Sequence, residues 1–250
     1  MAMHNNSALN ALKTFEKPYD VVRSAIVAWY YTIYESASAM TLAASGGNAE
    51  QHAKTARIWH ADIVRPGLAI GPFGLNVNTL VANDVKSEIK TLRNGSNFQL
   101  VDSPGSHDDA WGAACAYVSG TAGFEKWKVE ERVRASSEFK SLDVDSFRTK
   151  AARELRDGKL CNGHVNFLVQ AFRYRGKANY RDSIYLSYGA DRTLAVAQFL
   201  QDLFTVGCAF QRMASHYVSR RVNKANWGHF VADLDSNCLI ELVPDILVRE

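Results

Sequence analysis

The stretch Pro18–Ala44, PYDVVRSAIVAWYYTIYESASAMTLAA, decides the fold of this 250-residue chain. Its apolar side chains recur at steps of three and four residues, which predicts a helix with one buried face. The members of this stripe are Val22, Ile26, Trp29, Ile33, Ala37, Met40 and Ala44. Pro18 suits the first turn of a helix, and the pair Gly46-Gly47 is typical of its end.

A second stripe of this kind follows Asp191 and predicts a long helix over 191–222. Its members are Leu200, Leu203, Gly207, Phe210, Ala214 and Tyr217. Alternation of the strand type is almost absent, so we expect an all-α fold, a helical bundle. We expect Trp29 and Ile33 to pack against the second stripe near Leu203 and Phe210.

Shorter helices are expected between these two, at 48–64, 78–93, 109–133, 143–157 and 161–173, with Asp109 and Asp143 as caps. The segment 66–105 holds three of the five prolines and the turn sequences GPFG and NGSN. We interpret it as a loop-rich insertion within a single helical domain of residues 1–250. The segment 238–248 is expected to be a short strand or a final helix.

Composition excludes several classes of protein. The formal net charge of +3 neither requires nor excludes nucleic acid. The four cysteines lie far apart without a CxxC pair, which indicates reduced thiols in a cytoplasmic protein. No apolar run reaches the roughly 20 residues of a membrane span, so no membrane association is expected. Nucleotide-binding glycine loops and metalloprotease motifs are missing too, so we expect no cofactor and no metal.

The segment Phe172–Arg181, FRYRGKANYR, is the densest basic and aromatic part of the chain. Arginine and lysine neutralise phosphates, and aromatic rings offer faces on which bases stack. We interpret the segment as a turn between two helices, with Arg175, Lys177, Tyr180 and Arg181 as RNA-binding residues. The alternative is a solvated turn whose tyrosines close the edge of the core.

Arg212, His216 and Arg220 follow one another at steps of four in the last long helix, on the face opposite its apolar stripe. A histidine beside arginines can act as a general base while an arginine stabilises a phosphate, and Arg221 extends the positive charge towards RNA. The alternative is a plain solvated helix face. His52 and His60 share another helix face but stand about 12 Å apart, too far to bind one metal ion unaided.

Two regions resemble the HEPN superfamily (higher eukaryotes and prokaryotes nucleotide-binding domains). Ala25–Ala37, AIVAWYYTIYESA, is similar to the aromatic first-helix signature of small prokaryotic members. In those members the signature is followed by a glycine break and then by a histidine, which is His52 here. Arg173–Tyr180, RYRGKANY, is similar to their late turn before the last long helix. The resemblance implies a helical, often dimeric domain tied to RNA. It also implies a metal-independent ribonuclease with an arginine followed, four to six residues later, by a histidine.

The chain departs from that motif, since Arg173 is followed by Asn179 where the histidine would stand, and asparagine cannot shuttle a proton. We therefore expect an RNA-associated HEPN-like domain, a metal-independent endoribonuclease of a toxin–antitoxin or antiviral defence system. Its catalytic candidates are Arg173, Asn179, Arg212 and His216. The expected partners are RNA or a nucleotide, a second copy in a homodimer, and a partner protein.

Two alternatives stay open. The first alternative is a non-catalytic helical module that binds a partner protein or a nucleotide, which the asparagine at 179 favours. A weaker alternative is a helical enzyme whose site lies in the segment 66–105.

Overall fold

A computed structural model describes the chain except for residues 48–50, 97–103, 181–192 and 238–250. The described residues form ten α-helices, one π-helical turn and one 3₁₀ turn, and they contain no strand. The predicted all-α fold is therefore confirmed. Within the described ranges, no helix is long and apolar enough to cross a membrane. The predicted strand or helix at 238–248 lies outside the described residues.

The chain divides into two compact units. The first combines both ends of the chain, residues 1–70 and 171–250, and the second is the segment 71–170 between them. The second unit begins inside the expected insertion, 66–105, and continues far beyond it.

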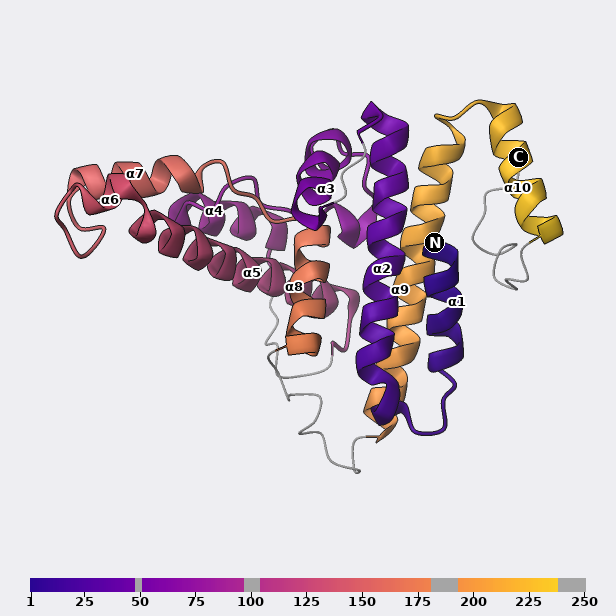
Figure 1. Cartoon of the computed structure of the whole chain (residues 1–250). Helices are drawn as coiled ribbons and strands as arrows, with labels where there is room; N and C mark the ends of the chain where they lie inside the picture. Colours follow the sequence, from indigo (N-terminus) through magenta and orange to yellow (C-terminus); the bar gives the residue numbers. More distant parts are fainter. Residues whose placement is uncertain (48–50, 97–103, 181–192, 238–250) are drawn as a thin grey trace. The chain divides into compact units, whose positions relative to one another are not determined.

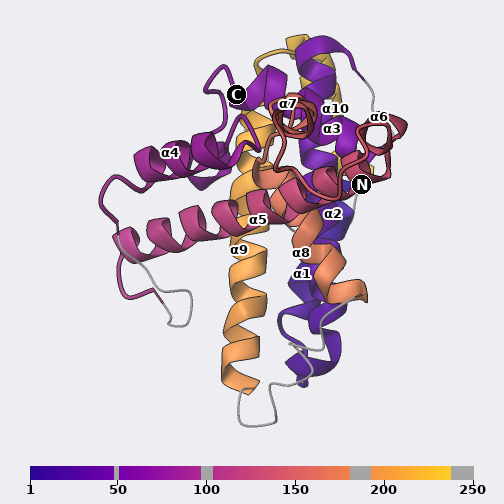
Figure 2. The ribbon, with the colours of Figure 1, turned by 90° about the vertical axis from the view of Figure 1, so that its left-hand side faces the viewer.

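Three helices form the body of the first unit: α1 (Ala2–Leu12), α2 (Pro18–Ser45) and α9 (Thr193–Ser219). Figures 1 and 2 show α2 and α9 side by side along much of their length, with α1 beside them. At one end of α1, Lys13 Nζ lies 3.7 Å from the ring centre of Phe204. Near the other end, Asn6 Nδ2 donates to Gln211 Oε1 at 2.8 Å, so α1 runs antiparallel to α9.

The two predicted stripes meet in this bundle. All members of the first are buried except Ala44, which is exposed in the last turn of α2 beside Gly46. The prediction was wrong at Ala44 because α2 ends there in a left-handed glycine. All six members of the second stripe are buried. At their contact, a Cβ built on Gly207 would lie 3.6 Å from Thr32 Cγ2 and 3.8 Å from Trp29 Cδ1.

Three further helices complete the first unit. Helix α3 (His52–Trp59) continues into the π-helical turn His60–Val64, and α10 (Lys224–Asn237) carries the buried Trp227. Helix α8 (Phe167–Tyr180) begins in the second unit and continues into the first. The basic segment 172–180 is therefore helical, and its prediction as a turn was wrong. A helix is compatible with this segment because Ala171 and Ala178, seven residues apart, are both buried on one face. The single glycine within it, Gly176, lowers helix stability at one position only.

The second unit contains a 3₁₀ turn (Gly71–Gly74), α4 (Ala82–Arg93), α5 (His107–Ala135), α6 (Ser137–Lys140) and α7 (Lys150–Leu160). Its core joins Val85 and Ile89 of α4 to Cys115 and Val118 of α5, and Figure 2 shows these helices side by side. Val77 pairs with Val165 in an isolated β-bridge, and both of these loop residues belong to the same core.

The helices at 107–135, 150–160 and 167–180 begin at other residues than the sequence predicts. Ser106, not Asp109, caps α5 by accepting from the Asp109 backbone N–H at 3.1 Å. Asp143 takes a left-handed φ of 49°, so α7 starts only after Thr149, whose hydroxyl accepts from Ala152. The predicted helix at 161–173 starts at Phe167, because Val165 is held in the bridge and Asn166 Oδ1 accepts from the Val169 N–H.

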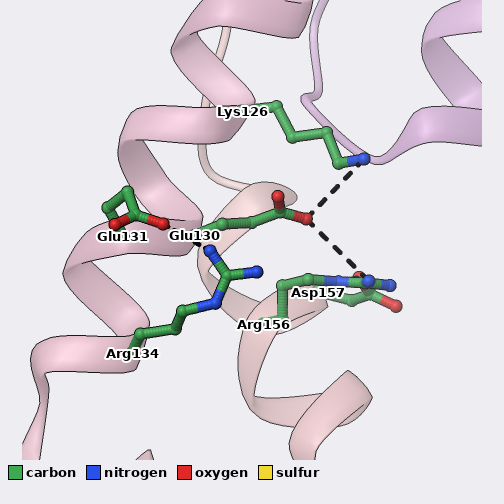
Figure 3. Close-up of polar contacts among 6 residues, drawn as sticks. All are labelled: Lys126, Glu130, Glu131, Arg134, Arg156 and Asp157. Atoms are coloured by element: carbon green, nitrogen blue, oxygen red, sulfur yellow. Dashed lines mark hydrogen bonds and ion pairs between the residues drawn. The ribbon is translucent and has the colours of Figure 1, made fainter. Parts of the chain in front are cut away.

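A group of ion pairs lies where α5 meets α7 in the second unit, and one of them, Glu130–Arg156, joins the two helices (Figure 3). Glu130 lies between Lys126 and Arg156, at 3.6 and 3.9 Å, and Arg156 also pairs with Asp157 at 2.8 Å. Because these side chains are only partly buried, each pair contributes at most about 1 kcal/mol. The pair of Glu130 with Arg156 thus helps to hold the two helices together.

Candidate functional site

Six residues of the first unit, brought together by α2, α3 and α8, form what we call the aromatic–arginine cluster. They are Tyr30, Tyr31, Tyr34, His52, Phe172 and Arg175. On α2 the three tyrosines stand at positions i, i+1 and i+4, which places them on one side of the helix. The cluster thus combines both regions that carry the sequence resemblance.

A hydrogen bond between Tyr30 and His52 forms the inner part of the cluster. The hydroxyl oxygen of Tyr30 lies 2.7 Å from His52 Nδ1. The imidazole also packs edge-on against Tyr34, at 4.4 Å between ring centres, and against Phe172, at 5.3 Å. Tyr30 is only 2% exposed, whereas His52 is half-buried. The ring of His52 is therefore held in one orientation while part of it faces solvent.

Arg175 lies over the aromatic rings. Its guanidinium carbon is 5.2 Å from the ring centre of Tyr30, 5.6 Å from that of Tyr31 and 5.8 Å from that of Phe172. Contacts of this length between a cation and an aromatic face are attractive. Within the described residues, no carboxylate forms an ion pair with Arg175, and its buried Nε has no hydrogen-bond partner. The cluster thus holds a positive charge that no acid neutralises there.

Burial and the nearby charge shift two pKa values in the cluster. Burial raises the pKa of Tyr30 above its ordinary value, and the positive charge of Arg175 opposes that rise only in part. Burial, and then Arg175, lower the pKa of His52 below its ordinary value of 6.5. At neutral pH, Tyr30 is therefore protonated and His52 is uncharged, so that the imidazole can accept a proton.

The predicted site residues of α8 fall into three groups. Arg175 belongs to the aromatic–arginine cluster, and Arg173 and Lys177 are half-buried on the same helix. Asn179 and Tyr180 form the end of α8. Arg181 lies outside the described residues.

The predicted site residues of α9 form a separate set. Arg212 and His216 are exposed on α9, and Arg220 is exposed in the turn just after its last residue, Ser219. Helix α9 supplies no member of the aromatic–arginine cluster. Arg221 covers the ring of Tyr217, with its guanidinium carbon 3.6 Å from the ring centre. The side chains predicted to form a positive face are thus exposed. The aromatic rings and the histidine that surround Arg175 come from α2, α3 and α8 instead.

Sequence reasoning did not find the pairing of His52 with Tyr30 and Arg175. The sequence indicates His52 only as a metal-ligand candidate and as part of the resemblance, because α3 and α8 lie far apart along the chain. The run Tyr30-Tyr31 with Tyr34 was the available signal, since three tyrosines on one side of a buried helix need polar neighbours. Among the described residues, no group of three histidines, cysteines or acids is placed to bind a metal ion.

Comparisons with protein-family models, with curated proteins and with solved structures gave no match. A function for this chain therefore has to be inferred from the arrangement of the cluster itself.

Proposed function

We propose that this protein is an RNA-associated, HEPN-like helical domain that binds RNA at the aromatic–arginine cluster. The observation that carries the proposal is Arg175, a half-buried guanidinium fixed over aromatic rings with no carboxylate partner among the described residues. Burying a charge without a counter-ion is unfavourable. An anionic ligand supplies the missing charge, and a phosphate fits the planar donor set of arginine.

The tyrosines and Phe172 favour a nucleotide over a simple anion. Aromatic side chains beside an arginine bind nucleic acid because each base presents a π-face and each linkage a phosphate. The cluster thus supports binding of RNA through both parts of a nucleotide.

The hydrogen bond of His52 favours a second function at the same cluster, metal-independent RNA cleavage. When Nδ1–H donates to the Tyr30 oxygen, Nε2 is free to accept a proton. His52 then removes the proton of a ribose 2′-hydroxyl, whose oxygen forms a bond to phosphorus as the bond from phosphorus to the 5′-oxygen breaks. The leaving oxygen takes a proton from solvent, and Arg175 stabilises the charge on the phosphoryl oxygens. His52 here takes the role that the sequence assigned to His216.

The resemblance alone extends the proposal to a biological setting. It favours a homodimer in the cytoplasm, a partner protein, and a role in toxin–antitoxin or antiviral defence. The non-catalytic interaction module stays the alternative if the cluster binds RNA without cutting it.

Fluorescence anisotropy with a labelled single-stranded RNA tests the binding. We expect Arg175→Gln to weaken affinity about tenfold or more, since a charge-assisted phosphate contact is lost. Arg57→Gln is the matched control. Arg57 is exposed on α3, and its substitution removes the same charge from the same unit. Equal affinity of the two variants, with circular dichroism unchanged, would refute the proposed site.

A further inference from the structure

Phe172 is an unusual member of the aromatic–arginine cluster because the residue is 43% exposed. Ala171 before it is buried, so α8 itself directs residue 172 towards the surface. Part of the ring is nonetheless anchored: it lies 5.3 Å from the His52 ring, at 31° between the planes, and 6.0 Å from the Tyr30 ring. A partly exposed aromatic side chain is thus held in place at the cluster.

The position of the Phe172 ring beside the charge of Arg175 restricts the kind of ligand that the cluster can bind. The guanidinium carbon of Arg175 is 5.8 Å from the ring centre of Phe172. A ligand that satisfies both groups presents a flat ring and an anion a short distance apart on one molecule. A nucleotide with an accessible base has this form, whereas inorganic phosphate or an acidic peptide supplies the anion alone.

We infer, resting on the RNA binding proposed above, that Phe172 makes the cluster selective for single-stranded RNA by stacking on one unpaired base. In a duplex both faces of each base are covered by its neighbours, and the deep, narrow major groove of A-form RNA does not admit a side chain. An unpaired base can turn out of its strand and lie on the exposed ring while its phosphate reaches Arg175. The ring supplies the selectivity, and both the ring and the charge of Arg175 contribute to the affinity.

The test compares three labelled ligands with the same number of phosphates: a single strand, a duplex of half its length, and a single strand of the full length whose central nucleotides lack bases. We expect the wild-type protein to bind the single strand most tightly. Phe172→Leu should weaken that binding roughly five- to 150-fold, the loss of one stacked base, and should bring it to the level of the strand without bases. Phe172→Trp should restore it.

Phe230→Leu is the matched control, because Phe230 is also 43% exposed and lies on α10 of the same unit, outside the cluster. The inference is overturned if Phe172→Leu behaves like Phe230→Leu, or if the wild-type protein binds duplex and single strand equally; RNA binding itself then stands. If no RNA form binds the wild-type protein, the proposed function fails, and the inference fails with it.

Discussion

The hydroxyl oxygen of Tyr30 lies 2.7 Å from Nδ1 of His52 and joins the buried side of α2 to the first residue of α3. This contact holds the imidazole through Nδ1, and the proposed reaction uses the other nitrogen, Nε2. It also gives the buried Tyr30 hydroxyl a partner. The pair therefore links the stability of the first unit to the properties of the proposed site.

Tyr30→Phe should lower the free energy of unfolding by about 0.5–1.5 kcal/mol, because it removes one hydrogen bond and leaves a half-buried imidazole nitrogen without its partner. Urea denaturation followed by circular dichroism measures the change. Tyr31→Phe, on the neighbouring half-buried tyrosine, is the control. An equal, negligible effect of both changes would show that the contact contributes nothing to folding.

The lowered pKa of His52 makes stability depend on pH. The unfolded chain takes up a proton near pH 6.5, while the folded protein resists protonation until a lower pH. The contribution of this residue is therefore fully present above 6.5 and is lost as the pH falls towards the folded-state pKa. Denaturation midpoints measured from about pH 7.5 to about pH 5 should fall more steeply for the wild-type protein than for His52→Gln. Parallel curves would contradict this origin of the pH dependence.

Trp29→Ala should cost about 3–5 kcal/mol of stability, since it opens a cavity where α2 meets α9 beside Gly207. Trp127→Ala serves as the comparison, because Trp127 is 49% exposed on α5. We expect the comparison variant to change the unfolding midpoint little. A loss below about 0.5 kcal/mol for Trp29→Ala would mean that the interface is placed wrongly.

Two glycines of the second unit should respond in opposite directions to alanine. A Cβ on Gly163 would collide with Leu80, whose Cγ would be only 2.7 Å away, so Gly163→Ala should cost about 1–3 kcal/mol. Gly158 lies within α7 with open space around its Cα. Gly158→Ala should therefore stabilise by about 0.4–1 kcal/mol. Thermal unfolding of both variants tests the packing around Leu80, and the same sign for both would contradict it.

The long helices were predictable because burial repeats along them. Ile26, Ile33, Leu200 and Phe210 occupy one face of their helices, and a 3.6-residue period needs no knowledge of tertiary structure. The start of α8 was not predictable, because Val165, just before it, pairs with Val77 far along the chain. Pairings of that kind are set by tertiary structure and leave no local periodicity.

The candidate site was predictable only in its parts. The sequence indicates Arg175 as an RNA contact and His52 as part of a resemblance, yet no spacing rule relates residues on separate helices. The structure brings them to Tyr30, with Arg175 over its ring and His52 at its hydroxyl. The basic face of Arg212 and His216 was easier to see because it repeats along one helix, and it lacks the aromatic partners.

Cleavage of RNA in the presence of chelator separates the two histidines. His52→Ala should lower the rate about 10²–10⁴-fold, the effect of losing a general base, and should leave RNA binding largely unchanged. His216→Ala should retain the wild-type rate, because His216 is exposed on α9. The reverse pattern would return the catalytic role to His216, and cleavage that requires added metal would refute the metal-independent reaction.

The central claim is that Arg175 contacts an RNA phosphate, and the salt dependence of binding tests it most directly. The slope of log affinity against log salt concentration should be smaller for Arg175→Gln than for the wild-type protein by about 0.7, the value for one phosphate contact on a single strand. Arg57→Gln should keep the wild-type slope. An unchanged slope for Arg175→Gln, with both proteins folded and RNA bound, would contradict the account.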